Sequence, residues 1–314
     1  MRGAAARIVI AEFMDDDAVA SLAREHDTHY DPLLFEHPAA LADALTDADA
    51  LIVRNRTDVN QALLAAALRL RVVGRLGVGL DNIDVEACAA RDIAVIPATG
   101  ANALAVAEYV VATAMLLLRG AYGATVDVAG GRWPRAALSN GREASAKTLG
   151  IVGFGGIGRL AARLAHGIGM RVAAHDPALP AGAEVWSEAD ATYVSLDDLL
   201  GVSDAVTLHV PITDATRRMI DARRLAAMKP GAVLINTARG GVVDEDAVAA
   251  ALRSGALGGA ALDVFEREPL SAPTALAGCP NLILTPHIAG VTRESNARVS
   301  AMIAERVTAF LAAS

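Results

Sequence analysis

Three polar residues near the end of the chain have the side chains that proton transfer beside a bound carboxylate requires: Arg239, Glu268 and His287. Each follows an apolar segment that we expect to form a buried strand, namely residues 233–238, 261–265 and 282–286. Ligands of open parallel sheets bind beyond the carboxyl ends of the strands. Arginine suits carboxylate capture, histidine is an acid–base group near neutral pH, and a neighbouring carboxylate favours the imidazolium. Any one of these residues could be an ordinary surface residue, but three at successive strand ends indicate a shared site, with Glu266 as an alternative acid.

A glycine-rich turn lies upstream, where residues 153–158 read Gly-Phe-Gly-Gly-Ile-Gly. The turn follows an expected strand, 149–152, and precedes an expected helix, 157–168, which is the context that a dinucleotide-binding turn requires. Its glycines permit a tight turn and close approach of the pyrophosphate, while the helix N-terminus offers free N–H groups to the phosphates. The next strand, 171–175, ends at Asp176, whose carboxylate can bind the ribose hydroxyls and would repel a 2′-phosphate. No arginine follows directly, so the sequence predicts NAD rather than NADP as the cofactor.

The composition limits the possible classes of protein. A chain of 314 residues, 54% hydrophobic and 20% charged, is long enough for two folded domains. Its net charge of -8 argues against non-specific nucleic-acid binding. Cys88 and Cys279 are the only cysteines, so we expect neither a disulfide framework nor a metal site, and we expect a reducing cytoplasm. The N-terminus lacks the apolar core of a signal peptide, and the most apolar stretch, 109–118, is too short to cross a bilayer.

Strands alternate with helices in two successive patterns, which predicts parallel crossovers. The expected strands of the first pattern are residues 8–10, 50–53, 71–73 and 93–96, and its expected helices are 16–24, 60–68 and 85–91. The second pattern starts near residue 148, and a final helix, 293–311, has no strand of its own. We therefore expect an α/β protein of two doubly wound parallel-sheet domains with a cleft between them. A discontinuous flavodoxin-like substrate domain would hold residues 1–98 and 290–314, and a Rossmann NAD-binding domain would hold residues 99–289.

Over essentially its whole length the chain resembles the D-isomer-specific 2-hydroxyacid dehydrogenases. The motifs that carry the resemblance are Asn-Thr-Ala-Arg-Gly, Phe-x-x-Glu-Pro and Thr-Pro-His-Ile, which contain Arg239, Glu268 and His287. The resemblance implies that these three form the catalytic set, and it selects Glu268 over Glu266. The chain departs from residues common in the family at two positions away from the proposed chemistry, Ala105 in place of serine and Ala146 in place of glycine.

The resemblance also extends the predicted sites. Asp263 matches an aspartate beside the nicotinamide, and the loop 77–84 matches a substrate loop whose N–H groups at Val78 and Gly79 face the carboxylate. The residues predicted to bind the cofactor are Gly153, Gly155, Gly156, Ile157, Gly158, Asp176, His209, Pro211, Thr237, Ala238 and Asp263. The residues predicted to bind the substrate are Arg54, Asn55, Arg56, Arg75, Val78, Gly79, Asn102 and Arg239. The apolar helix 103–118 and the stretch 120–147 resemble the family's dimerisation elements, so we expect a homodimer.

Arg54, Arg56 and Arg75 follow expected strands of the first pattern and supply more positive charge than lactate or glyoxylate requires. A second anionic group at C3 of the substrate would explain them; alternatively, some form salt bridges with Asp58, Asp81 or Asp84. The surrounding segments, 53–57, 74–82 and 98–102, resemble those of bacterial (S)-sulfolactate dehydrogenases, and basic segments also occur in phosphoglycerate dehydrogenases.

The predicted reaction is therefore NAD-dependent oxidation of (S)-3-sulfolactate to 3-sulfopyruvate. The alternatives are a D-3-phosphoglycerate dehydrogenase and a hydroxypyruvate or glyoxylate reductase. A different class of function, a non-catalytic NAD-sensing corepressor, is disfavoured because no partner-binding extension or basic surface is evident and the catalytic set is intact. We expect no nucleic-acid or membrane partner, and no regulatory domain after the last helix.

Overall fold

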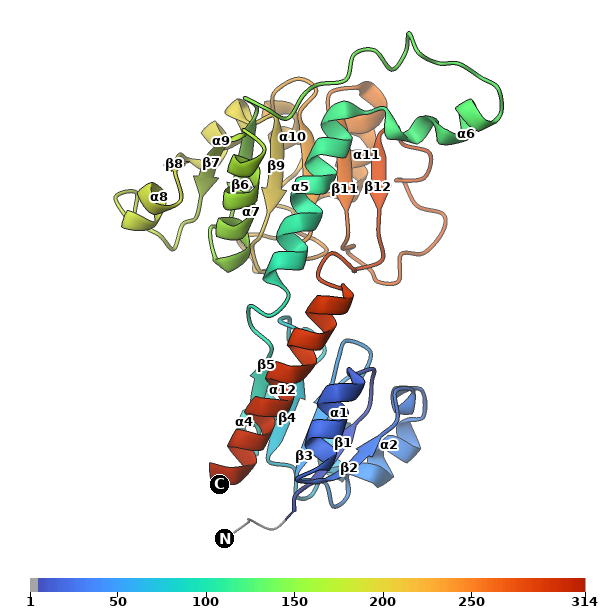
Figure 1. Ribbon diagram of the computed structural model, residues 1–314, viewed down its shortest axis with the longest axis vertical. Helices are drawn as coiled ribbons and strands as arrows, with labels where there is room; N and C mark the ends of the chain where they lie inside the picture. Colours follow the sequence, from blue (N-terminus) through green and yellow to red (C-terminus); the bar gives the residue numbers. More distant parts are fainter. Residues whose placement is uncertain (1–4, 314) are drawn as a thin grey trace. The chain divides into compact units, whose positions relative to one another are not determined.

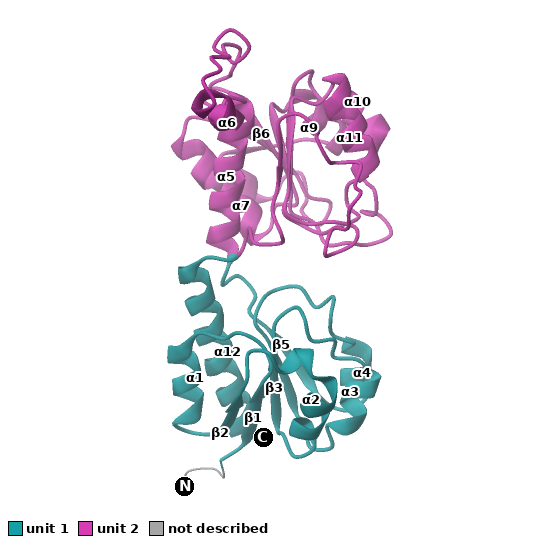
Figure 2. Ribbon diagram, turned by 90° about the vertical axis from the view of Figure 1, so that its right-hand side faces the viewer, with its two compact units in different colours: residues 1–102, 291–314 teal, residues 103–290 magenta. Residues whose placement is uncertain are grey.

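The structure is a computed structural model that describes residues 5–313 (Figure 1). It divides into two compact units (Figure 2): unit 1 holds the residues up to Asn102 together with those from Val291 onward, and unit 2 is Ala103–Gly290. The first boundary lies after Asn102 rather than after residue 98. The reason is that the segment between them is tied to unit 1, where Ala98 N donates to the carbonyl of Arg75 (3.2 Å) and Ala101 O accepts from Arg298 Nε (3.0 Å).

Unit 1 is built on a five-stranded parallel sheet of order β2-β1-β3-β4-β5, the arrangement of flavodoxin-like folds. Its strands are β1 (Arg7–Ile10), β2 (Asp27–Tyr30), β3 (Ala50–Val53), β4 (Val72–Arg75) and β5 (Ala94–Pro97). One face is covered by α1 (Asp16–Ala23) and α12 (Arg293–Ala313). The other face is covered by α2 (Pro38–Leu45), α3 (Gln61–Ala66) and α4 (Val85–Ala89), with the short η1 (Leu34–Glu36) before α2.

The edge strand β2 is absent from the strands that the sequence predicts. Its residues, Asp-Thr-His-Tyr, alternate between exposed and half-buried positions, and it pairs only with β1. A polar edge strand lacks the apolar run by which buried strands such as β3 are identified. The five-stranded order therefore emerges only from the structure, although its doubly wound class agrees with the prediction.

Unit 2 is built on a seven-stranded parallel sheet of order β12-β11-β10-β9-β6-β7-β8. Its strands are β6 (Thr148–Val152), β7 (Arg171–His175), β8 (Ala191–Tyr193), β9 (Ala205–Leu208), β10 (Val233–Asn236), β11 (Gly259–Leu262) and β12 (Leu282–Leu284). One face packs against α5 (Ala103–Arg119) and α7 (Gly156–Gly167), with α8 (Glu184–Glu188) beside β8. The other face packs against α9 (Leu196–Val202), α10 (Ala222–Ala227) and α11 (Glu245–Ser254) (Figure 2). The strand order reverses between β6 and β9, the point at which such sheets bind dinucleotides.

Within the described part of the chain, no single helix is both long and apolar enough to cross a membrane. The helix α5 meets that test only together with the segment Tyr122–Ala129, formed by η2 (Tyr122–Ala124) and α6 (Thr125–Ala129), and the two are bent by 74°. The buried residues of α5, among them Val110, Ala114 and Leu117, belong to the core of unit 2.

Ala146, where the family resemblance leads us to expect glycine, has a left-handed backbone with φ +60 and an exposed side chain. A left-handed conformation costs an L-residue about 1 kcal/mol, whereas glycine adopts it freely. We therefore predict that Ala146→Gly raises the free energy of unfolding by about 1 kcal/mol or slightly less, measured by urea denaturation. Ala90→Gly is the matched control, because Ala90 is also exposed but has φ -63, and it should not be stabilised. Equal destabilisation by both changes would refute the strain at Ala146.

Candidate active site

His287 and Glu268 are in direct contact in unit 2. His287 Nδ1 lies 2.7 Å from Glu268 Oε2, and Glu268 Oε1 accepts a hydrogen bond from Phe265 N (3.0 Å), which fixes the carboxylate. The His287 side chain is 43% exposed, so its second ring nitrogen, Nε2, is placed to exchange a proton with a ligand. Glu266, the alternative acid, instead pairs with Arg218 Nη2 (3.2 Å). The geometry therefore places Glu268 rather than Glu266 beside the histidine.

The loop that carries His287 is held by Asp263, whose side chain is 1% exposed. Asp263 Oδ1 accepts hydrogen bonds from Thr285 Oγ1 (2.6 Å) and Ile288 N (2.8 Å), and Oδ2 accepts one from Ala289 N (2.8 Å). His287 itself has φ +57, and its N–H donates to the carbonyl of Asp263 (2.8 Å). These bonds hold a non-glycine residue in a conformation that is costly unless its surroundings impose it. The predicted contact of Asp263 with the nicotinamide stays a prediction.

A hydrogen-bonded chain connects this loop to helix α5. Tyr109 OH lies 2.7 Å from Thr285 Oγ1. Because Thr285 Oγ1 donates its proton to the Asp263 carboxylate, it must accept a proton from Tyr109. Burial raises the pKa of Tyr109, and the charge of Asp263 adds to this effect, so Tyr109 remains a donor at neutral pH. Sequence reasoning missed Tyr109 and Thr285 because neither side chain suggests chemistry by its type.

Arg239 follows β10 in a loop that is fixed from inside the sheet. The buried Asn236 accepts a hydrogen bond from Ala238 N through Oδ1 (3.1 Å) and donates one from Nδ2 to the carbonyl of Arg239 (3.1 Å). A Cβ atom on Gly240 would lie only 1.7 Å from the carbonyl oxygen of Phe265. The Arg239 loop therefore packs directly on the loop that follows β11 and leads to Glu268. The sequence reasoning did not single out Asn236 either, although this residue fixes the loop that carries Arg239.

The glycine turn after β6 has the geometry that a bound pyrophosphate requires. Gly153 has φ +92, and a Cβ there would lie 2.4 Å from the carbonyl oxygen of His209. A Cβ on Gly158 would lie 2.4 Å from the carbonyl oxygen of Gly153, so helix α7 approaches the turn closely. Gly155 and Gly156 face open space, and α7 begins there without a side-chain cap. Its first N–H groups are thus available to phosphates.

Three further observations fit NAD. Asp176 Oδ2 accepts from Phe154 N (2.8 Å) and Oδ1 from Ala178 N (2.9 Å), which fixes the carboxylate beside the glycine turn. Each oxygen retains capacity to accept from a ribose hydroxyl. Within residues 5–313, the buried Thr237 Oγ1 at the end of β10 has no hydrogen-bond partner, as expected of an atom that meets a ligand. His209 and Pro211 follow β9, the strand beside β6, at the point where the strand order reverses.

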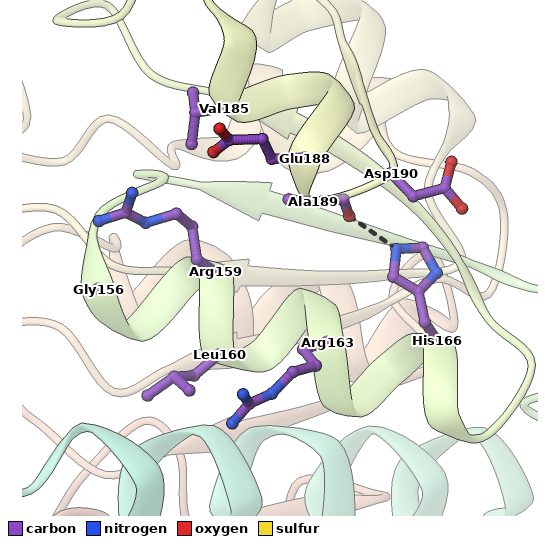
Figure 3. A pocket seen from close by; sticks show the side chains of 9 residues that line it. All are labelled: Gly156, Arg159, Leu160, Arg163, His166, Val185, Glu188, Ala189 and Asp190. Carbon is purple, nitrogen blue, oxygen red and sulfur yellow. Dashed lines mark hydrogen bonds between the residues drawn. The ribbon is translucent and has the colours of Figure 1, made fainter.

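A surface hollow of about 520 Å³ begins at Gly156 and runs between α7 and α8 (Figure 3). Arg159 and Arg163 project from α7, and the His166 ring contacts the carbonyl of Ala189 at 3.1 Å. None of the residues that line it belongs to the catalytic set. The hollow therefore borders the glycine turn and lies apart from the predicted catalytic residues in the sequence.

The substrate residues predicted at the start of the chain lie at the carboxyl edge of the unit 1 sheet. Arg54, Asn55 and Arg56 follow β3, and Arg75 ends β4, where it is in register with Val53. Val78 and Gly79 follow β4 in the next loop, and Asn102 Oδ1 is buried without a hydrogen-bond partner within the described residues. The structure therefore places the basic residues at one edge of the unit 1 sheet, while the predicted catalytic set belongs to unit 2.

Arg54 and Arg56 are not paired with the aspartates that the alternative interpretation required. Arg54 Nη2 donates to Asn296 Oδ1 (2.6 Å), and its guanidinium lies 5.9 Å from the centre of the Phe13 ring. Arg56 lies 4.9 Å from the centre of the Phe35 ring. In the part of the chain that the structure describes, neither arginine forms an ion pair with a carboxylate. Burial lowers the pKa of Arg54, although the charge of Glu12 opposes the change.

His209 provides a pH test of unit 2. Burial lowers its pKa from 6.5 to about 4, so the folded protein keeps the ring neutral while the unfolded chain takes up a proton near pH 6.5. The free energy of unfolding therefore has its full value above pH 6.5. It decreases by up to about 3 kcal/mol as the pH falls towards 4, because the unfolded chain then binds a proton that the folded protein does not. We predict that His209→Gln loses less stability than the wild type between about pH 7 and about pH 4.5 in urea denaturation. Parallel losses in the two proteins would refute a neutral, desolvated His209.

Comparison with known proteins agrees with this geometry. Residues 111–289 match the family described as "D-isomer specific 2-hydroxyacid dehydrogenase, NAD binding domain". The chain is 54% identical to the (S)-sulfolactate dehydrogenase of Chromohalobacter salexigens over 96% of both chains. It is 39% identical to the hydroxypyruvate reductase of Thermotoga maritima over 85% of this chain and 86% of that one. The crystal structure of the TT0316 protein from Thermus thermophilus is similar with a TM-score of 0.88, at 32% identity, over 98% of this chain and 97% of that one.

The family, the two doubly wound domains and the NAD cofactor that the sequence predicts are thus confirmed. The roles of the individual site residues stay predictions. The chain belongs to the D-isomer-specific 2-hydroxyacid dehydrogenases and is an NAD-dependent oxidoreductase of small anionic hydroxy acids.

Proposed function

We propose that this enzyme interconverts (S)-3-sulfolactate and 3-sulfopyruvate with NAD. The observation that carries the proposal is the pair Arg54 and Arg56, two cations on one loop whose partners are an amide and aromatic rings rather than carboxylates. A substrate with a single carboxylate does not require them, because Arg239 can hold that group. The similarity to a sulfolactate dehydrogenase favours a sulfonate as the second anion.

The residues of unit 2 have complementary roles in this reaction. When bound, NAD accepts the hydride that leaves C2 of the hydroxy acid. His287 takes the hydroxyl proton in that direction and, in the reverse direction, donates it to the keto oxygen from its protonated form. Glu268, 2.7 Å away, stabilises the imidazolium that exists between these steps. Arg239 binds the substrate carboxylate and polarises the C2 oxygen. Unit 1 supplies the cations for the group at C3 and is the substrate-binding domain of this proposal.

Phosphate in place of sulfonate is the second candidate, because a D-3-phosphoglycerate dehydrogenase would use the same two cations. A hydroxypyruvate or glyoxylate reductase would leave Arg54 and Arg56 without a ligand group. A non-catalytic NAD-sensing corepressor would have no use for the contact between His287 and Glu268. These differences make the identity of the group at C3 the property to measure.

We also propose that the enzyme works as a cytoplasmic homodimer. Residues 120–146 form a long segment between α5 and β6 that carries exposed apolar side chains. Tyr122 is 65% exposed, and Val126 and Trp133 are each 77% exposed. Apolar side chains gathered on one segment are typical of a surface that another chain covers. The two free thiols, of which Cys88 is buried, support a cytoplasmic location.

The first prediction of this proposal concerns substrate preference, measured as NADH oxidation. We expect kcat/KM for 3-sulfopyruvate to exceed that for pyruvate by about a hundredfold or more, because charge-assisted hydrogen bonds to the C3 anion are lost with pyruvate. Arg56→Gln should lower kcat/KM for sulfopyruvate at least tenfold and that for pyruvate much less. Arg69→Gln is the matched control, an exposed arginine of unit 1 that pairs with Asp49 at 3.3 Å.

Each other outcome of this assay rejects a defined part of the proposal. Preference for 3-phosphohydroxypyruvate would replace the sulfonate with a phosphate. Preference for hydroxypyruvate, glyoxylate or pyruvate would reject a C3 anion. Turnover of no keto acid above the His287→Ala blank would reject the enzymatic function and favour the corepressor-like one.

The second prediction separates the two neighbouring acids. Glu268→Gln keeps the shape and a hydrogen bond to His287 but removes the charge that stabilises the imidazolium, so kcat should fall about ten- to a hundredfold. The KM for NADH should change little. Glu266→Gln is the control, since its carboxylate pairs with Arg218 instead, and it should retain most of the wild-type kcat. A comparable loss of kcat in both variants would contradict the role assigned to Glu268.

A further inference from the structure

Glu12 is a buried carboxylate of unit 1 to which neither the sequence nor the family resemblance assigns a role. It follows β1, is only 3% exposed, and accepts hydrogen bonds from four consecutive backbone N–H groups. Oε1 accepts from Arg54 (2.8 Å) and Thr57 (3.0 Å), and Oε2 accepts from Asn55 (3.2 Å) and Arg56 (3.0 Å). The entire backbone of the arginine loop is thus fixed to one side chain.

Consecutive N–H groups that converge in this way form a cradle of the kind that binds anions. Here the cradle is already filled by the protein's own carboxylate. The loop backbone cannot then receive an anionic group of the substrate, and the guanidinium groups of Arg54 and Arg56 remain for that purpose. Asn82 completes the support, since its Nδ2 donates to the carbonyl of Thr57 (2.7 Å).

The outer end of Arg54 is fixed as well. Asn296, from the C-terminal helix α12, accepts a hydrogen bond from Arg54 Nη2 at 2.6 Å, and Phe13, the residue after Glu12, lies beneath the guanidinium. An amide oxygen and an aromatic face orient a cation without neutralising it. Arg54 is therefore held at both ends and still carries its full charge.

We propose that Glu12 and Asn296 are the positioning residues for recognition of the C3 anion: Glu12 fixes the backbone of the arginine loop, and Asn296 orients the Arg54 guanidinium. This inference rests on the proposed function, in which the loop binds a second anionic group of the substrate. Neither residue takes part in proton transfer. Their effect is confined to discrimination between keto acids with and without an anion at C3.

The test compares kcat/KM for 3-sulfopyruvate with that for pyruvate in each variant. Glu12→Gln places an amide donor against two of the four N–H groups, so the loop must shift; a displacement of about 1 Å can cost up to a hundredfold. We expect the ratio of sulfopyruvate to pyruvate to fall tenfold or more, mainly through KM for sulfopyruvate. Asn296→Asp is the second variant: it preserves the size of the side chain but pairs Arg54 with a carboxylate, and it should lower the same ratio about tenfold.

Asp49→Asn is the matched control. Asp49 is also a buried carboxylate of unit 1 that accepts a backbone N–H, from Arg7 at 2.8 Å, but it precedes β3 at the opposite end of the sheet. It should lower the urea midpoint without changing the substrate ratio.

If the wild type shows no preference for a C3 anion, the proposed function itself fails. If the wild type shows the preference but Asn296→Asp and Glu12→Gln match the ratio of Asp49→Asn, only the positioning inference is overturned. If Glu12→Gln fails to fold, the result for Asn296→Asp decides the test: an unchanged ratio of sulfopyruvate to pyruvate in that variant overturns the positioning inference.

Discussion

The position of His287, the proposed acid–base residue, depends on hydrogen bonds to one buried carboxylate, that of Asp263. A loop that leaves the edge of a parallel sheet carries N–H groups with no strand partner, and burying them unpaired is costly. Asp263 accepts hydrogen bonds from two of these N–H groups and from the Thr285 hydroxyl. The same three bonds compensate for the burial of the Asp263 carboxylate. Through Thr285 and Tyr109 the network reaches α5, one of the helices in the core of unit 2. His287 therefore stands on a rigid support although its own side chain faces solvent.

In unit 1 a buried carboxylate also accepts the backbone N–H groups of a loop at the end of a strand. Glu12 receives the N–H groups of the loop after β3, as Asp263 receives those of the loop after β12. In both units the carboxylate that organises the loop is buried, and the side chain that the loop presents is a cation or an imidazole. The role that the structure supports for both acids is to fix the backbone of the loops that carry the predicted site residues.

The sequence alone predicts the parts of this architecture that depend on apolar runs and on residue type. Strands such as β3 and β10 are buried at every position and were identified by their continuous apolar residues. The polar edge strand β2 was missed for the opposite reason. Likewise, the types of Arg239 and His287 indicate chemistry directly. Glu12 and Asn296 resemble ordinary surface residues in the sequence, because their roles arise from tertiary hydrogen bonds; Asn296 is 242 residues from its partner Arg54.

The partners of Arg54 themselves favour an anionic ligand. Two other cations of this protein meet a carboxylate: Arg142 and Lys229 both pair with Asp204. Arg54 instead meets an amide oxygen and an aromatic ring, and the desolvation that lowers its pKa exceeds the attraction of Glu12. Burial of a cation without a neutralising partner destabilises the unliganded protein. That cost is offset when an anion binds, so the arrangement favours a ligand that supplies negative charge. In the proposed function that charge is the group at C3 of the substrate, because Arg239 is assigned to the carboxylate at C1.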